Sequence, residues 1–141
     1  MAALVDTNVL VYRFDSRDPH KQRSAREVLR GGLLAGTLRI PHQALLEFVS
    51  ATTRPATSGA PLLPAVDAWH EMQNFMTLYP VLYPTADVLR AAVHGCALHG
   101  LSWLDAHLWA FAEVFGLDEI LSEDFQDGRL YGRVRARNPF A

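Results

Sequence analysis

Short apolar runs alternate with longer amphipathic segments along the whole chain. Apolar runs of three to five residues bounded by Asp, Gly or Pro are typical of buried strands, whereas apolar residues that recur every three or four positions predict helices. The pattern predicts strands at residues 2–5, 38–41, 80–84 and 118–122, with the C-terminal segment 128–141 as a candidate fifth strand. It predicts helices at residues 18–32, 42–53, 65–77, 85–99 and 102–116, and a loop at 54–64.

Regular alternation of strands and helices predicts a parallel sheet covered by helices on both faces. Asp18 and Pro19 are typical of a helix start, and the glycines at 31 and 32 indicate where that helix ends. The chain has 141 residues, half of them apolar, so we expect a single domain over residues 1–141.

Three apolar stripes predict which helix faces are buried. Helix 18–32 presents Ala25, Val28 and Leu29. The second stripe comprises Leu89, Ala92, Val93 and Cys96. We expect this stripe to be buried, and a buried single thiol fits a protein in a reducing compartment. The third stripe is expected in the core, with a partner-binding face as the alternative, and it comprises Val66, Trp69, Met72 and Met76.

Charge is unevenly distributed, although the formal net charge is only −2. Ten of the thirteen basic residues lie in segments 13–30 and 129–137, while the centre of the chain is acidic. These basic segments, with Arg133 and Arg135 in the second, are candidates for holding a polyanion. The chain starts without a basic signal-peptide region, and no apolar run approaches the roughly 18 residues of a membrane span, so we expect a cytoplasmic protein with no membrane contact.

Four acidic residues come from four separate predicted elements. Asp6 directly follows the first strand and Asp124 the fourth, and open α/β sheets bind ligands at the carboxyl ends of strands. Glu47 has small neighbours on its helix. Asp105 lies on a largely apolar stripe, where an unpaired charge is costly.

Each acid also has a structural interpretation. Asp6 is a candidate helix cap, Asp105 fits a capping box with Ser102, Asp124 fits a turn, and Glu47 fits an exposed helical position. Their origin in four elements favours one shared site. The six histidines show no metal-binding spacing, and His107 lies about 200° from Asp105 around a helix, so we interpret them as structural or surface residues.

Clustered carboxylates repel one another, and without a cation some take up a proton. A site made of oxygen ligands favours Mg²⁺ or Mn²⁺ over zinc. Such ions support phosphodiester hydrolysis, and the basic segments would hold the polyanionic substrate. The residues therefore predict metal-dependent cleavage of a phosphodiester.

The segments LVDTNVLV, LLEF, SWLDAHLWAFA and ILSEDFQDG resemble the PIN domain, and more narrowly the VapC toxins of bacterial toxin–antitoxin pairs, from residue 3 to about 132. The resemblance implies a three-layer α/β/α sandwich with a central parallel sheet. It also implies a Mg²⁺- or Mn²⁺-dependent endoribonuclease that cleaves RNA, a homodimer, and a small VapB-like antitoxin that blocks the site.

Carried over by position, the resemblance assigns the metal-binding and catalytic set to Asp6, Glu47, Asp105 and Asp124. It makes Asn8 and Ser102 polar supports and Asp127 an additional candidate. Glu123, Asp124 and Asp127 compete for the fourth acidic position. Asp124 is preferred because it comes directly after the predicted fourth strand and the neighbouring Glu123.

Two other functions remain open. One is a catalytically inactive PIN-like domain that binds a partner. The other is an aspartyl-phosphate phosphotransfer domain, which is disfavoured because the single lysine, Lys21, lies on an early helix and Asn8 replaces the second Asp of such phosphatases.

Overall fold

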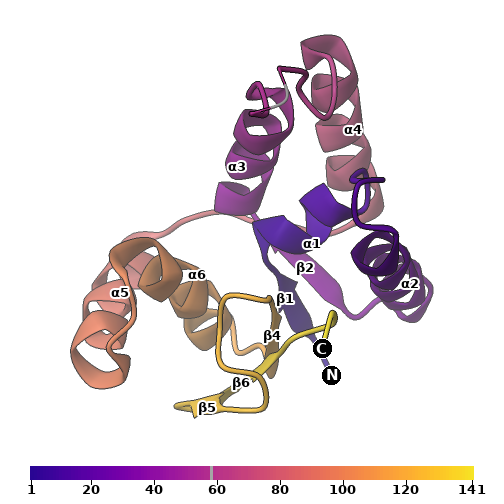
Figure 1. Ribbon diagram of the computed structural model, residues 1–141. Helices are drawn as coiled ribbons and strands as arrows, with labels where there is room; N and C mark the ends of the chain where they lie inside the picture. Colours follow the sequence, from indigo (N-terminus) through magenta and orange to yellow (C-terminus); the bar gives the residue numbers. More distant parts are fainter. Residues whose placement is uncertain (58) are drawn as a thin grey trace.

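Six strands form one sheet in the computed structural model, which describes residues 1–57 and 59–141 (Figure 1). The sheet order is β3-β2-β1-β4-β6-β5, and the strands are β1 (Ala3–Val5), β2 (Leu38–Pro41), β3 (Val81–Leu82), β4 (Glu119–Leu121), β5 (Leu130–Tyr131) and β6 (Val134–Arg137). All neighbouring pairs are parallel except β5 with β6. The mostly parallel sheet is confirmed, and the candidate fifth strand is a hairpin.

The helices are α1 (Thr7–Tyr12), α2 (Pro19–Ala35), α3 (His42–Thr53), α4 (Ala65–Leu78), α5 (Ala86–His99) and α6 (Trp103–Val114). Among the residues that the structure describes, no helix is long and apolar enough to cross a membrane.

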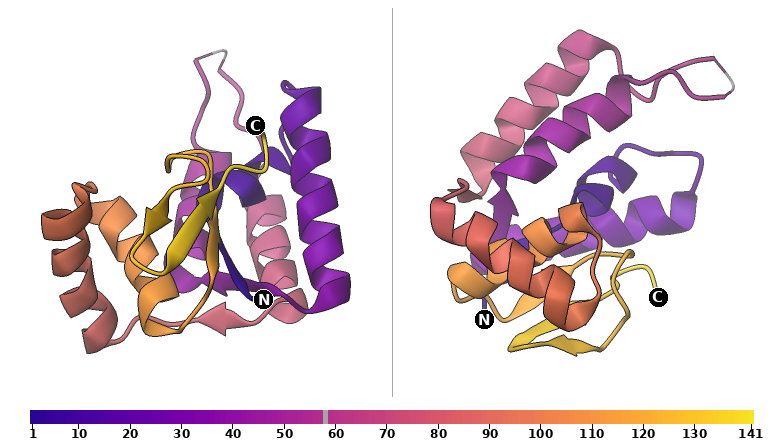
Figure 2. Two further views of the ribbon diagram at one scale, coloured as in Figure 1. Left: turned by 90° about the horizontal axis from the view of Figure 1, so that it is seen from below. Right: turned by 90° about the vertical axis from the view of Figure 1, so that its left-hand side faces the viewer.

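Two buried apolar clusters lie on opposite faces of the sheet. In β1, Val5 belongs to the cluster formed with α1 to α4, whereas Leu4 belongs to the cluster formed with α5 and α6. This alternation follows from the two-residue repeat of a strand. Figures 1 and 2 show α5 and α6 on one side of the sheet and α1 to α4 on the other. The predicted three-layer α/β/α arrangement is therefore confirmed.

Helix α2 extends past the predicted end. Gly31 and Gly32 lie inside the helix, which ends at Gly36 with a positive φ of 69°. A Cβ on Gly32 would lie 2.2 Å from the Cγ of Leu38. Gly32 therefore serves the close packing of the helix against β2 and does not stop the helix.

The stripe predicted to bury Cys96 is only partly buried. Ala92 is buried and Cys96 is half-buried, but Leu89 and Val93 are 52% and 58% exposed. Helix α5 instead packs on α6 through its small residues, since a Cβ on Gly95 would lie 2.8 Å from the ring of Trp109. The predicted inner face was thus rotated from the observed one.

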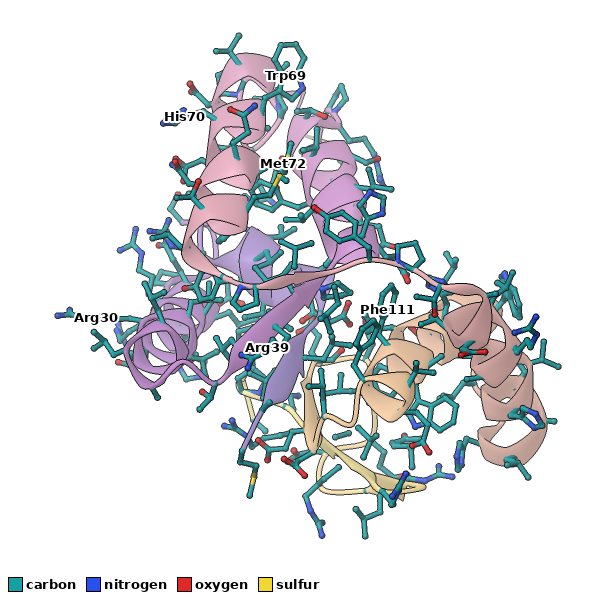
Figure 3. The ribbon with its side chains drawn as sticks, turned by 180° about the vertical axis from the view of Figure 1, so that it is seen from behind. Arg30, Arg39, Trp69, His70, Met72 and Phe111 are labelled. Carbon is teal, nitrogen blue, oxygen red and sulfur yellow. The ribbon has the colours of Figure 1, made fainter. Side chains whose placement is uncertain are left out.

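Helix α4 also carries its apolar stripe mainly on the outside. Val66 and Trp69 are 68% and 54% exposed, and Met76 is also exposed, so the core expectation for this stripe was wrong. Met72 is half-buried and points between α4 and α3 (Figure 3). The buried face of α4 is formed by Ala68 and Phe75.

Candidate active site

Asp6 lies where β1 ends and α1 begins, and its side chain is 7% exposed. Its Oδ1 accepts a hydrogen bond from the Thr7 backbone N–H at 2.6 Å, which makes Asp6 the cap of α1. Its Oδ2 accepts hydrogen bonds from Ser122 Oγ at 2.6 Å and from Asn8 Nδ2 at 3.3 Å. Asp6 is therefore a helix cap, and its second carboxylate oxygen faces β4.

Asn8 and Ser102 were expected to support the acids, and Asn8 does contact two of them. Its Nδ2 lies 3.3 Å from Asp6 Oδ2 and 3.2 Å from Asp124 Oδ2. Ser122 joins the same group, because its Oγ accepts from the Asp124 backbone N–H at 3.0 Å. Strands β1 and β4 are adjacent and parallel, so the residues that follow them lie together at the carboxyl ends of the strands.

Glu47 approaches the same edge from α3. Its Oε2 accepts from Thr7 Oγ1 at 2.7 Å and its Oε1 from Gln43 Nε2 at 3.0 Å. Leu45 and Phe48 are buried on the adjoining face of α3. The helix thus holds Glu47 beside the residue that follows Asp6.

Asp105 lies in the first turn of α6 and is half-buried. Ser102 Oγ accepts from the Asp105 backbone N–H at 3.3 Å, so Ser102 caps α6 through the backbone of Asp105. Within residues 1–57 and 59–141, the Asp105 carboxylate makes no hydrogen bond or ion pair. Its charge is near enough to Asp124 to raise the pKa of that carboxyl.

Burial raises the pKa of Asp6 to about 7. The charges of Asp124 and Glu47 raise the pKa further, while the hydrogen bonds from Ser122 and Thr7 lower it. Desolvation disfavours a charged carboxylate, and neighbouring negative charges act in the same direction.

Burial also raises the pKa of Asp124, although this residue is more exposed than Asp6. The charges of Asp105, Glu123 and Glu47 act in the same direction, and the hydrogen bond from Asn8 opposes them. The predicted acids are thus close enough to repel one another.

The other two acids that follow β4 have different partners. Glu123 accepts hydrogen bonds from Lys21 Nζ at 2.7 Å and from Tyr12 Oη at 2.9 Å. Asp127 accepts from the Asn138 backbone N–H at 2.8 Å and is exposed. Of the three candidates for the fourth position, Asp124 is the one that shares Asn8 with Asp6.

Arg133 and Arg135 lie away from these acids. Arg135 pairs with Glu119 at the start of β4, whereas Asp6 and Asp124 follow the ends of β1 and β4. Arg133 is 3.8 Å from Glu113, and Arg135 donates to the Gly128 carbonyl at 2.7 Å. The two arginines therefore lie toward the opposite ends of the strands.

The acidic site has the donor chemistry of a Mg²⁺ or Mn²⁺ site, because its side chains offer oxygen ligands. Asn8 Oδ1 adds a buried oxygen that has no hydrogen-bond partner in the part of the chain described. No three His, Cys, Asp or Glu side chains of that part are placed to hold an ion together. Mg²⁺ usually takes one or two carboxylates and completes its shell with water, so Asp6 and Asp124 fit such a site.

Several polar residues at this site were not predicted. Ser122 could have been predicted from the sequence, because it directly follows β4 as Asp6 directly follows β1. Gln43 and His107 could not, because their link joins α3 to α6: His107 Nδ1 hydrogen bonds to Gln43 Oε1. Burial lowers the pKa of His107.

A family model and several solved structures match the chain. The family model "PIN domain" matches residues 3–130. No curated protein matches the chain. Among solved structures, the fold is similar to a toxin–antitoxin complex from Klebsiella pneumoniae, with 19% identity, 98% of each chain covered and a TM-score of 0.65.

Two further structures are similar in fold. VapBC2 from Rickettsia felis, bound to a promoter DNA fragment, has 12% identity, 98% of each chain covered and a TM-score of 0.71. Mycobacterium tuberculosis VapC20, a sarcin–ricin loop cleaving toxin, has 18% identity, 87% of this chain and 90% of that chain covered, and a TM-score of 0.64. With a family model that matches nearly its whole length, the chain belongs to the PIN-domain family.

Proposed function

We propose that this protein is a Mg²⁺- or Mn²⁺-dependent endoribonuclease that acts in the cytoplasm as the toxin of a toxin–antitoxin pair. The observation that carries the proposal is the shared contact of Asn8 Nδ2 with Asp6 and Asp124. It joins two carboxylates from adjacent strand ends, with Glu47 and Asp105 close enough to affect their pKa values. PIN-family membership and the similarity to a sarcin–ricin loop cleaving toxin support RNA as the substrate.

Asp6 and Asp124 would hold the metal ion, with Glu47 and Asp105 completing the acidic set. When bound, such an ion polarises a phosphoryl oxygen and makes water a better nucleophile. Ser122 and the Thr7 backbone hold the Asp6 carboxylate in one orientation. Asn8 sets the separation of Asp6 from Asp124. Asp105 would contribute its carboxylate from the first turn of α6.

The proposed partner is a small VapB-like antitoxin, since the similar structures include toxin–antitoxin complexes. An apolar pocket of about 400 Å³ between α3 and α4 supports a protein partner, and its lining includes Leu46, Val49, Trp69, Met72 and Met76. Leu89 on α5, with Trp103 and Leu104 on α6, lines another surface pocket, and these exposed apolar side chains support a homodimer.

The alternative of an aspartyl-phosphate domain is less well supported. Lys21 does lie near the acidic edge, but its ammonium group is engaged by Glu123 and Tyr12. The matched family model is also that of a PIN domain. An inactive partner-binding domain differs from the proposed enzyme in one measurable property, which is hydrolysis by the purified protein.

Purified protein should therefore cleave RNA with Mg²⁺ or Mn²⁺ and lose this activity in EDTA. Asp6→Asn and Asp105→Asn should each abolish cleavage while the circular dichroism spectrum stays native. Asp67→Asn, an exposed acid on α4, is the matched control and should cleave like wild type. Cleavage that survives in both site variants would remove the catalytic assignment, and a wild type without activity would favour the partner-binding domain.

A further inference from the structure

The Glu47 carboxylate is held at both oxygens, and one of the two donors belongs to a longer hydrogen-bonded chain. Thr7 Oγ1 donates to Oε2, and Gln43 Nε2 donates to Oε1. Gln43 lies four residues before Glu47, so both project from one face of α3. Gln43 Nε2 also lies 3.5 Å from the Leu104 carbonyl oxygen on α6.

These contacts determine how the Gln43 amide is oriented. A carboxylate and a backbone carbonyl can only accept hydrogen bonds, so the group that faces Glu47 and Leu104 must be the NH₂. The amide oxygen, Oε1, then faces His107 Nδ1. Because Oε1 accepts, the proton of the neutral imidazole lies on Nδ1.

His107 is itself held by its own helix. Its ring packs edge-on against Phe111, with 5.2 Å between ring centroids and an interplanar angle of 89°. The side chain is half-buried. The imidazole therefore gives the Gln43 amide a fixed partner on α6.

The resulting chain runs from His107 through Gln43 and Glu47 to Thr7. It joins α6, which packs on one face of the sheet, to α3 and α1, which pack on the other. This hydrogen-bonded chain passes from one face of the sheet to the other at the carboxyl ends of β1 and β4, beside Asp6. Nothing else in the proposed function requires Gln43 or His107.

We propose that Gln43 and His107 are positioning residues that hold the Glu47 carboxylate toward the divalent-cation site. The inference rests on the proposed function, because it requires that the acidic site binds a metal ion. Both residues act on the site through the Glu47 carboxylate, Gln43 by direct contact and His107 through Gln43. Hydrogen-bond partners that orient metal-binding side chains commonly change metal affinity by about 10- to 100-fold when they are removed.

The test is Mn²⁺ binding to the full chain, measured by isothermal titration calorimetry without RNA. Gln43→Leu and His107→Leu should each raise the Kd for Mn²⁺ by about 10- to 100-fold. The double variant should bind no more weakly than the weaker single variant, because both changes break the same chain. His107→Asn keeps an N–H donor and should stay within about threefold of wild type.

Matched controls are Gln73→Leu on α4 and His94→Leu on α5, both exposed, and both should bind like wild type. If Gln43→Leu does not fold, Gln43→Met keeps the length of the side chain without the N–H donor and should weaken binding by a similar factor. Unchanged Kd values in the folded leucine variants would overturn the inference while leaving the proposed function intact. Additive losses with no rescue by His107→Asn would also overturn it. A wild type that binds no Mn²⁺ would refute the metal site and the inference together.

Discussion

At the scale of single residues, Asp6 combines two roles that usually belong to different side chains. It caps α1 through the Thr7 backbone, and it places a carboxylate in a site where burial and neighbouring charges oppose ionisation. A capping carboxylate normally stabilises a helix by about 1 kcal/mol. Here the stabilisation is offset by the cost of keeping the group charged.

This cost predicts a pH dependence of stability in EDTA. The pKa of Asp6 is about 7 in the folded protein and near 3.8 in the unfolded chain, so between these values the folded state binds the extra proton. The unfolding free energy contributed by Asp6 therefore falls as pH rises from about 4 to 7 and is constant above. Asp6→Asn lacks this titration.

Thermal melts of wild type and Asp6→Asn from pH 5 to pH 8 check this expectation. The Tm of the variant relative to wild type should become more positive as pH rises, and Mg²⁺ should remove the trend by stabilising the charged form. A difference in Tm that stays constant with pH would show that Asp6 is ionised throughout this range.

Part of the site could be predicted residue by residue. Asp6 and Asp124 were placed correctly together because strand ends in a parallel sheet share an edge. Gln43 and His107 were not, because they are 64 residues apart and meet only after α3 and α6 have packed around the sheet. Spacing along one helix describes the direction of His107 but not its partner.

At the scale of elements, the start of α6 contains one polar side chain with a structural role, Ser102, and one with a proposed functional role, Asp105. Ser102 caps the helix by accepting from a backbone N–H, and the Asp105 carboxylate does not take part in the cap. Loss of an N-cap side chain costs about 1 kcal/mol, whereas loss of a repelled charge does not.

Ser102→Ala should therefore lower stability by about 1 kcal/mol in both EDTA and Mg²⁺. Asp105→Asn should melt at or above the wild-type Tm in EDTA and should respond less to Mg²⁺. For wild type, Mg²⁺ at ten times its Kd should add about 1.4 kcal/mol, or roughly 3–6 °C. A loss of stability in Asp105→Asn with and without metal would assign that carboxylate to the helix cap.

Helix α1 was not predicted, although Asp6 was named as a candidate helix cap. Its sequence, TNVLVY, contains three β-branched residues, which favour strands over helices. Its helical form depends on the Asp6 cap and on burial of Val9 and Leu10 against the other helices. Tertiary packing decided the conformation of this segment. Longer helices with clear periodicity were predicted, and the bounds of α3 match the observed ones, whereas α2 runs past its predicted end.

At the scale of the whole molecule, charge is separated along the strand direction. The acids gather where β1 and β4 end, and Arg133 and Arg135 lie toward the opposite ends of the strands. An RNA that contacts both would pass over the side of the sheet that carries the β5–β6 hairpin. The two arginines would then add to binding without entering the acidic site.

Arg133→Ala combined with Arg135→Ala should weaken RNA binding and reduce its salt dependence by roughly 0.7 units of slope for each lost phosphate contact. The rate of cleavage at saturating RNA should not change. Fluorescence anisotropy over a series of salt concentrations measures the slope, with Arg90→Ala on α5 as the control. An unchanged slope would place the RNA elsewhere on the surface.

The sheet ends on both sides in very short strands. The edge strands β3 and β5 have two residues each, so neither offers a long row of free backbone groups to another chain. Exposed edges are where strands of separate molecules join and aggregate, and short edges suppress this. Two copies of this protein would therefore associate through side chains on their helices. A high concentration of the protein in a cell would not by itself produce a continuous intermolecular sheet.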